Sequence, residues 1–229
     1  MPRQKQTKGI CTHCGNEIAK GSVTKHLATC PQIQESIGKA EGSKAVAESL
    51  YHLRVEDAYQ KQFWLDLEIG GTKTLNHLDT YLRGIWLECC GHLSEFMLGS
   101  GRLAETIGMQ RKIGDVFSQA EEKLTHIYDF GTSSETLVKL VGMRLGKPLT
   151  KKPIALLVRN KMPEVQCIKC DQPATHLCLE CQYEDEVWGA LCDKHAKTHP
   201  HNNYGEPIPL VNSPRLGMCG YEGPAEPPY

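Results

Sequence analysis

Twelve cysteine and histidine side chains in this 229-residue chain are spaced as metal-ligand pairs. They are Cys11, Cys14, His26, Cys30, Cys167, Cys170, Cys178, Cys181, Cys192, His195, His199 and His201. Thiolate and imidazole are the ligands that Zn²⁺ prefers, and a structural site uses four of them in a closed tetrahedron. The twelve side chains therefore predict three zinc ions. Closed sites leave no position for a catalytic water, so the pattern predicts architecture rather than a reaction.

The first four ligands predict a CCHC-type zinc finger over residues 1–32. Their pattern is C-x2-C-x11-H-x3-C, with Gly15 directly after the second cysteine. Residues 22–30 are expected to form a short helix that places His26 and Cys30 one turn apart, and Pro31 is expected to end it. Because so short a segment cannot bury a sufficient core, the finger should fold only with metal.

The last eight ligands predict two zinc ions in one module, which with its tail spans residues 161–229. Their pairs alternate as in a cross-brace, and the pattern resembles a B-box-type zinc module. In that arrangement one ion is bound by Cys167, Cys170, Cys192 and His195, and the other by Cys178, Cys181, His199 and His201. Sequential pairing of neighbouring ligands is also compatible with the spacing. His176 is a reserve ligand, although a surface position is the more common outcome for such a residue.

Three cysteines lie outside this pattern. Cys89 and Cys90 end an apolar stretch, where a free cysteine behaves as a small hydrophobe. Cys219 lies in a Gly-rich tail as either a buried thiol or a contact to a neighbouring module. The odd total of eleven cysteines and the metal spacing of eight of them favour a reducing compartment, and we predict a cytoplasmic protein. No apolar run approaches the roughly 20 residues that span a bilayer, and the polar N-terminus does not read as a secretory signal.

Between the zinc modules, the hydrophobic pattern predicts an α+β core domain over residues 46–160, preceded by a polar linker over 33–45. Alternating apolar residues predict strands over 49–55, 62–69, 92–98, 123–130, 135–143 and 154–159. Residues 113–117 are expected to form a short turn or strand. One helix over 74–90 carries an apolar stripe of Leu75, Leu78, Leu82, Ile85, Trp86 and Cys89. The fold class is therefore an antiparallel sheet with one main helix on one face.

Several core segments resemble one known family. Residues Tyr51–Val55, Phe63–Ile69, Thr74–Asp79, Ile85–Phe96 and Tyr128–Gly131 are similar to the plasmid Ri open-reading-frame-three-like domain family, whose members are often described as transposon passenger proteins. The resemblance covers about residues 48–160, and the flanking zinc ligands and the segment 211–221 look like a zinc-bearing branch. The family has no established activity, so the resemblance implies a type of domain and no reaction.

This chain departs from the family at polar positions. The commoner family pattern reads His-Leu-His-Glu-Phe and Tyr-Asp-Phe-Gly-Asp-Ser-Trp-Glu-His. Here Ser94 stands at the second histidine of the first motif, and Thr132, Ser134 and Thr136 replace the second Asp, the Trp and the final His of the other motif. If the family has a metal or acid–base site at these positions, this chain lacks most of it.

The net charge of −1 conceals two basic segments. Residues 1–30 carry five Lys/Arg and one acid, and residues 139–161 carry seven Lys/Arg and no acid. If both lie on one face, they could contact a polyanion through Arg3, Lys5, Lys8, Lys20, Lys25, Lys147, Lys151, Lys152, Arg159 and Lys161. About five phosphate contacts predict a log–log salt slope near −4 to −5. The alternative is a solvated finger and a lysine-rich edge strand that resists aggregation.

The core offers one constellation for acid–base or metal chemistry, formed by His92, Glu95, Asp129 and Glu135. An aspartate just before a glycine turn is more often a turn cap, and the chain has no phosphate-binding glycine loop, nucleophile elbow or HExxH motif. We therefore favour a non-enzymatic zinc-binding adaptor that contacts protein or nucleic acid through its terminal modules. The alternatives are a DNA-binding or structured (including ribosomal) RNA-binding protein, and a hydrolase or nuclease using His92 and Asp129. The sequence indicates no membrane and no small-molecule substrate.

Overall fold

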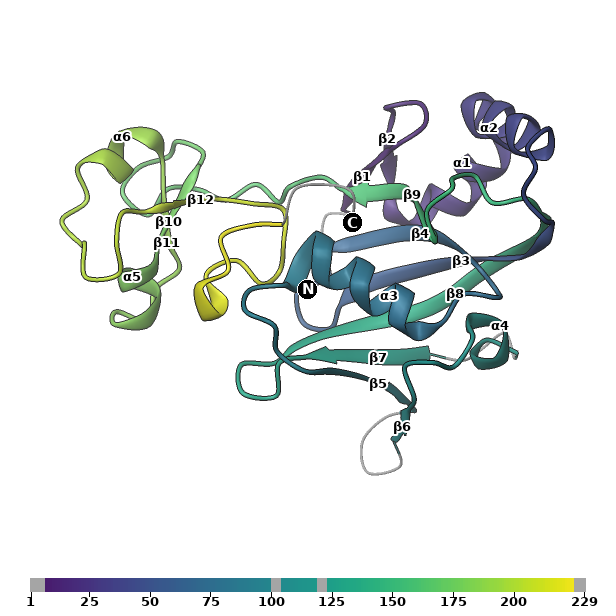
Figure 1. The fold of residues 1–229 in the computed structure, drawn as a ribbon. Helices are drawn as coiled ribbons and strands as arrows, with labels where there is room; N and C mark the ends of the chain where they lie inside the picture. The colour runs from purple at the N-terminus through teal and green to yellow at the C-terminus, as the bar shows by residue number, and fades with distance from the viewer. Residues whose placement is uncertain (1–6, 100–103, 119–122, 225–229) are drawn as a thin grey trace, which may run out of the picture.

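A large antiparallel sheet organises the chain in the computed structural model, which describes residues 7–99, 104–118 and 123–224 (Figure 1). Its strands, in chain order, are β1 (Lys8–Cys11), β2 (Glu17–Ala19), β3 (Glu48–Asp57), β4 (Trp64–Gly70), β5 (Ser94–Leu98), β6 (Glu105–Ile107), β7 (Lys123–Tyr128), β8 (Ser134–Gly146) and β9 (Ile154–Asn160). The spatial order is β2-β1-β9-β4-β3-β8-β7-β5-β6. All neighbouring pairs are antiparallel, which confirms the predicted α+β class.

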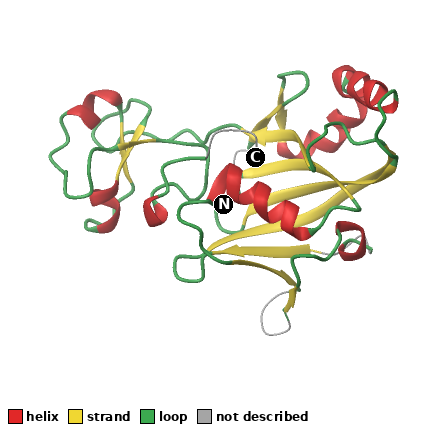
Figure 2. Ribbon diagram, in the orientation of Figure 1, coloured by secondary structure: helices red, strands yellow, loops and turns green. Residues whose placement is uncertain are grey.

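Helices are few and short beside this sheet (Figure 2). They are η1 (Lys20–Ser22), α1 (Val23–Thr29), α2 (Pro31–Glu41), α3 (Leu75–Leu82), η2 (Arg83–Leu87), α4 (Ile113–Val116), α5 (Leu179–Tyr183), α6 (Asp193–Lys197) and η4 (Met218–Gly220). The C-terminal part adds a small sheet of β10 (His176–Cys178), β11 (Gly189–Leu191) and β12 (Ile208–Pro209) in the order β11-β10-β12. Among the described residues, no helix has the length and apolar character needed to cross a bilayer.

The main helix packs its predicted stripe on the sheet. Leu75, Leu78, Leu82, Ile85 and Trp86 are each 0% exposed within one core cluster. A capping box begins α3, because the side chains of Thr74 and His77 each accept from the other residue's backbone. The regular α-helix ends at Leu82 and continues as the π-helical turn η2 to Leu87, so the predicted helix over 74–90 extends three residues too far at its C-terminal end. Glu88 leaves the helix with extended backbone.

Trp86 gives a direct test of this packing. Its ring is fully buried, so Trp86→Ala should leave a cavity that costs about 3–5 kcal/mol of unfolding free energy, measured by urea titration with circular dichroism. The matched control is Trp188→Ala, because that ring is 45% exposed and its loss should change stability by at most about 0.5 kcal/mol. Equal effects of the two substitutions would contradict the assignment of Trp86 to the core.

The N-terminal hairpin continues the core sheet. β1 pairs with β9 through Gly9↔Asn160, Ile10↔Arg159 and Cys11↔Val158. The ring of Trp64, on β4, is fully buried in a cluster with residues from β1, α1 and β9. A side chain at Gly9 would meet the Trp64 ring at 2.6 Å, so the glycine is needed for this close approach. The predicted boundaries at 1–32, 33–45, 46–160 and 161–229 remain predictions about independent folding units.

Two segments differ from their predicted secondary structure. Most of the predicted linker over 33–45 lies in helix α2, which runs through Glu41. Pro31 ends the preceding helix as expected and also begins α2 at its first turn, where its missing N–H costs nothing. Ile33 and Ala40 are buried at a helical spacing of seven, which explains why the polar segment is ordered. Residues 113–116 form helix α4 instead of a turn or strand.

Candidate metal centres

The N-terminal ligands come together as one group, which we call the finger cluster. Cys11 ends β1, Cys14 follows in the knuckle, and His26 and Cys30 lie on and just after α1. The four ligand atoms lie within 4.8 Å of one another. Cys14 Sγ is 3.5 Å from His26 Nε2. With Zn–S near 2.3 Å and Zn–N near 2.0–2.1 Å, a tetrahedral ion places sulfur and nitrogen about 3.5 Å apart, so the group has the right size for zinc.

The C-terminal ligands form two groups in alternating order, as in a cross-brace. The first module cluster is Cys167, Cys170, Cys192 and His195, and the second module cluster is Cys178, Cys181, His199 and His201. Sequential pairing is therefore not the arrangement of this structure. His176, the reserve ligand, lies outside both groups and contacts Thr175 and Asp193 instead.

Distances in both module clusters are those of tetrahedral edges. His195 Nδ1 lies 3.4 Å from Cys167 Sγ, 3.5 Å from Cys170 Sγ and 3.4 Å from Cys192 Sγ. In the second cluster, Cys181 Sγ lies 3.2 Å from His199 Nε2 and 3.3 Å from His201 Nδ1. Such edges measure about 3.5 Å for sulfur–nitrogen and about 3.8 Å for sulfur–sulfur around zinc.

In the first module cluster, the surroundings of Cys167 favour the thiolate form of that cysteine. Burial raises the pKa of the Cys167 thiol, but backbone N–H groups of Cys192 and Lys169, together with His195, outweigh burial and bring the pKa to about 6. The thiolate is the form that binds a metal ion, so the surroundings of Cys167 favour its ligand form. At Cys170 a backbone hydrogen bond lowers the pKa, but burial and the neighbouring thiols Cys192 and Cys167 outweigh it and raise the pKa.

A fourth group, which we call the fourth cluster, consists of Cys89, Cys90, His92 and Cys219, and the ligand spacing in the sequence does not predict it. The first three follow η2 in the loop before β5, and Cys219 lies on η4, far along the chain. Cys90 is exposed and therefore is not the small buried hydrophobe that was expected. The available sequence signal was the Cys-Cys-x-His run together with the unassigned Cys219. Only the fold shows that these two segments meet.

The candidate acid–base constellation assembles only in part, because His92 and Asp129 meet while Glu95 and Glu135 contact other residues. His92 Nε2 lies 3.4 Å from Asp129 Oδ2, but Glu95 accepts a hydrogen bond from Thr106 on β6. Glu135 is hydrogen-bonded to Tyr59 and raises the pKa of that phenol. Asp129 caps a turn, since its Oδ1 accepts from the backbone N–H groups of Gly131 at 2.9 Å and Thr132 at 3.2 Å.

The charge on Asp129 also argues against a role as general base. The hydrogen bond from Arg215 lowers the pKa of this carboxyl to about 2, against the opposing effect of burial. A base with so low a pKa takes up a proton poorly near neutral pH. Asp129 instead holds the C-terminal segment, because its Oδ2 accepts from Arg215 Nη2 at 2.7 Å and the Arg215 side chain is 0% exposed.

Arg215 connects the tail to the core through several further contacts. Its Nη1 donates to the Thr132 carbonyl and to Ser134 Oγ, both at 2.9 Å, and its Nη2 lies 3.4 Å from Cys89 Sγ. Ser213 Oγ donates to the Trp86 carbonyl at 2.7 Å. The tail is therefore part of the core structure and carries Cys219 to the fourth cluster.

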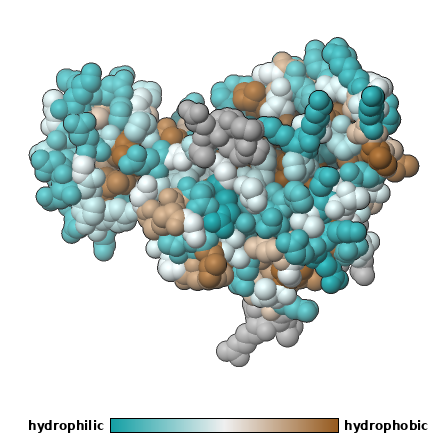
Figure 3. All heavy atoms as spheres, in the orientation of Figure 1, coloured by the Kyte–Doolittle hydropathy of each residue, from teal (hydrophilic) through white to brown (hydrophobic). Residues whose placement is uncertain are grey.

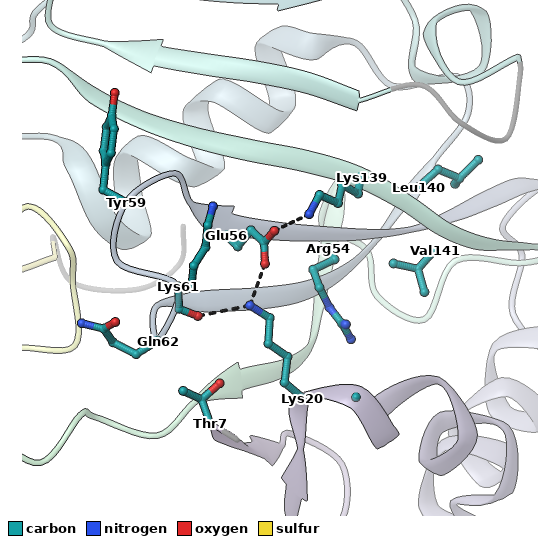
Figure 4. A pocket seen from close by; sticks show the side chains of 11 residues that line it. Thr7, Lys20, Arg54, Glu56, Tyr59, Lys61, Gln62, Lys139, Leu140 and Val141 are labelled. Atoms are coloured by element: carbon teal, nitrogen blue, oxygen red, sulfur yellow. Dashed lines mark hydrogen bonds and ion pairs between the residues drawn. The ribbon is translucent and has the colours of Figure 1, made fainter. Parts of the chain in front are cut away.

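A pocket of about 770 Å³ lies between the finger and the core and has a basic lining (Figure 4). Lys20 donates to Glu56 at 2.6 Å, and Lys139 also contacts this carboxylate. Burial raises the pKa of Glu56, but the hydrogen bonds from Lys139 and Lys20 lower it to about 2. Arg54 is paired with Asp66 at 3.0 Å. The cations of this pocket are largely neutralised by the protein's own carboxylates.

The two basic segments lie side by side, because β1 and β9 are paired. Many of their cations nevertheless have internal partners. Lys8 and Lys161 both contact Glu17, Lys147 donates to the carbonyls of Glu41 and Ser43, and Arg159 donates to the Asn212 carbonyl. Within the described ranges, Lys25, Lys151 and Lys152 are exposed and have no side-chain ion pair. Arg3 and Lys5 lie outside the described residues.

Comparison with known proteins adds a limited structural similarity. No protein-family profile and no curated protein matches the chain. Among solved structures, the chain is similar to MM3350, a protein of unknown function from Methanosarcina mazei Go1. The two share 18% identity over 48% of this chain and 67% of that one, with a TM-score of 0.40. The chain is thus an α+β protein with four Cys/His clusters, similar in part to a structure without a known function.

Proposed function

We propose that the chain is a zinc-binding interaction protein without catalytic activity, whose C-terminal module docks a protein partner. The alternating ligand clusters carry the first part of the proposal, since closed sets of four protein ligands act structurally. They would make this module a B-box-type cross-brace. All eleven cysteines are free thiols, and we place the protein in a reducing compartment such as the cytoplasm.

Exposed apolar side chains on the C-terminal module support a protein partner. Ile168, Tyr183, Val187, Trp188 and Tyr204 are each 40–46% exposed, and the rings of Tyr183 and Tyr204 are 5.5 Å apart. Figure 3 shows hydrophobic residues among the mainly hydrophilic surface of this lobe, at the left of the view. Tyrosine and tryptophan are enriched at binding hot spots.

The net negative charge of the C-terminal module favours a protein partner over a nucleic acid. Residues 162–229 contain four basic and ten acidic side chains, which oppose phosphate contacts and suit a basic protein surface. Nucleic-acid binding remains a second candidate for the two basic segments, because the β1–β9 pairing brings them side by side at one end of the sheet. Three exposed cations without internal partners then support about three phosphate contacts and a salt slope near −3, shallower than the sequence predicts.

One experiment tests both candidates. The full chain is captured from cell lysate with and without nuclease, beside the variant Trp188→Ala. We expect a protein partner that survives nuclease and is reduced about tenfold or more by the substitution, as for a hot-spot residue. Lys194→Ala, an exposed position in the same module, serves as the control and should retain the partner.

A titration with purified components tests nucleic-acid binding, the second candidate function. Duplex DNA and structured RNA are titrated from 50 to 200 mM salt with the wild type and with a Lys25, Lys151 and Lys152 triple alanine variant. A slope near −3 that the triple variant abolishes supports a nucleic-acid interface. Loss of the captured partner on nuclease treatment, together with such a slope, would overturn the protein-adaptor proposal.

The resemblance of the core to the plasmid Ri open-reading-frame-three-like family is also part of this proposal. It concerns the core over about 48–160, and we propose that this core is a domain of that type carrying added zinc modules. No reaction follows from this proposal. The core then serves as the scaffold on which the finger and the C-terminal module are held.

A further inference from the structure

We infer that the fourth cluster is a zinc site that clasps the C-terminal tail to the core. Its ligands would be the thiolates of Cys89, Cys90 and Cys219 and the Nε2 atom of His92. The site is independent of the proposed partner, because it follows from ligand geometry alone. It would join residues more than one hundred positions apart and so fix the path of the chain between the core and the C-terminal module.

The distances carry this inference. Cys90 Sγ lies 3.0 Å from His92 Nε2, and His92 Nε2 lies 3.2 Å from Cys219 Sγ. The sulfur atom of Cys90 is 3.7 Å from that of Cys89 and 3.8 Å from that of Cys219. A sulfur–sulfur edge around tetrahedral zinc is about 3.8 Å, so three thiols and one imidazole already surround a position of the correct size.

The orientation of His92 distinguishes this site from a simple ion pair. Its Nε2 lies 3.4 Å from Asp129 Oδ2, beyond the usual hydrogen-bond range of about 2.7–3.2 Å. The same nitrogen lies closer to two sulfur atoms. Asp129 is already bound by Arg215, which leaves the imidazole nitrogen directed at the thiols.

Neighbouring groups would support a metal–thiolate centre. Three thiolates and one Zn²⁺ carry a net charge of −1. The Arg215 guanidinium, 3.4 Å from Cys89 Sγ, supplies a buried positive charge and an N–H donor to that sulfur. Hydrogen bonds to ligand atoms of this kind orient the ligands and adjust their basicity.

The backbone of the tail is shaped to present Cys219. Cys219 has φ +49°, a left-handed conformation that a non-glycine residue adopts at a cost. Gly217 at φ +78° and Gly220 at φ +70° make the tight turns on either side of it. Local strain of this sort persists where surrounding structure requires it, and it often marks a functional position.

Two other uses of these thiols fit the geometry less well. A disulfide requires sulfur atoms about 2.05 Å apart, whereas Cys90 and Cys219 are 3.8 Å apart. A catalytic zinc needs an open coordination position, but here four protein ligands fill the tetrahedron. The arrangement therefore indicates a structural ion.

Exposure sets this site apart from the other three. Each of those clusters contains two buried ligands, whereas none of the four ligands here is buried. A chelator can reach such an ion without opening the fold. We therefore expect a brief treatment with a colorimetric chelator to release one zinc per chain rapidly and the remaining three slowly.

The test counts zinc in full-length protein purified anaerobically with added Zn²⁺ and a non-thiol reductant. The wild type should hold four ions per chain, and Cys219→Ala from the tail and Cys90→Ala from the core should each hold three. Met218→Ala, next to Cys219, is the control and should hold four. Each alanine variant at the fourth cluster should lose the rapid chelation phase and become sensitive to proteolysis near residue 219 while keeping its core circular dichroism.

The outcomes separate this site from the other modules. Three ions in the wild type, unchanged by Cys219→Ala, would overturn the fourth site and leave the predicted three intact. A Cys90–Cys219 disulfide detected by mass spectrometry in the anaerobic protein would also overturn it. Fewer than three ions in the wild type would instead contradict the zinc modules on which the proposed function depends.

Discussion

Cys181→Ser should remove two zinc ions from the chain, although it replaces a ligand of only one cluster. Cys181 belongs to the second module cluster, which also includes Cys178 at the end of β10. Cys192 and His195 of the first module cluster follow β11 and lie on α6, and β10 pairs with β11. Two zinc ions bound at these clusters would therefore hold the same three-residue strands, so loss of one site should unfold the support of the other.

The expected effect is large because bound zinc would supply most of the module's stability. Its buried apolar residues are few, chiefly Leu177, Ala190, Leu191 and Ile208. A structural zinc site contributes roughly 10–16 kcal/mol in small zinc-dependent domains, far more than such a core provides. The core of the variant should remain folded, because none of the buried residues in its main hydrophobic cluster is a zinc ligand.

Zinc counting and limited proteolysis check this prediction. The variant should hold two fewer ions than the wild type and be cut within residues 165–205, while the core resists cleavage. Lys197→Ala, an exposed position on α6, should retain the full zinc content. Loss of a single ion, with the module still protected, would show that the two sites fold independently despite the shared sheet.

The spacing of residues identifies twelve candidate ligands but leaves alternating and sequential grouping of the last eight open, and the structure groups them alternately. C-x2-C and C-x2-H pairs lie in tight knuckles, so their partners are close in sequence or in the next pair. The fourth cluster could not be obtained this way, because Cys219 meets Cys90 only after the tail has packed against the core. The buried contact between Arg215 and Asp129, which directs that path, has no local sequence signal.

Strands and helices were predicted correctly where a regular spacing of apolar residues determines them. Features that depend on contacts between distant segments were not predicted. β3 and β8 follow clear alternation, and the helix stripe is buried as its spacing indicates. Helix α2 was not predicted, because the polar composition of residues 33–45 hid its two buried residues, Ile33 and Ala40. The pairing of β1 with β9 was not predicted, because the sequence of a strand does not indicate which distant strand it pairs with.

That pairing changes the expected result of removing the finger's metal. The sequence alone suggests that Cys14→Ser would unfold the finger and leave the core's melting temperature nearly unchanged, because a linker would separate them. In the structure, Trp64 of β4 is 0% exposed in a cluster that includes Cys11, Val23 and Cys30. Its Nε1 also donates to Thr7 Oγ1 at 3.0 Å.

Cys14→Ser should therefore release one zinc ion and also destabilise the core. Unfolding of the finger uncovers one face of Trp64 and leaves β9 without its partner β1. Exposing a large apolar side chain costs about 1.5–3 kcal/mol, so the core should melt at a clearly lower temperature and tryptophan fluorescence should shift to the red. Lys25→Ala, an exposed residue on α1, is the control and should leave both readings unchanged. A core that melts as in the wild type after the finger zinc is lost would mean that the shared sheet transmits no stability, and the finger would then be an independent domain as its spacing first suggested.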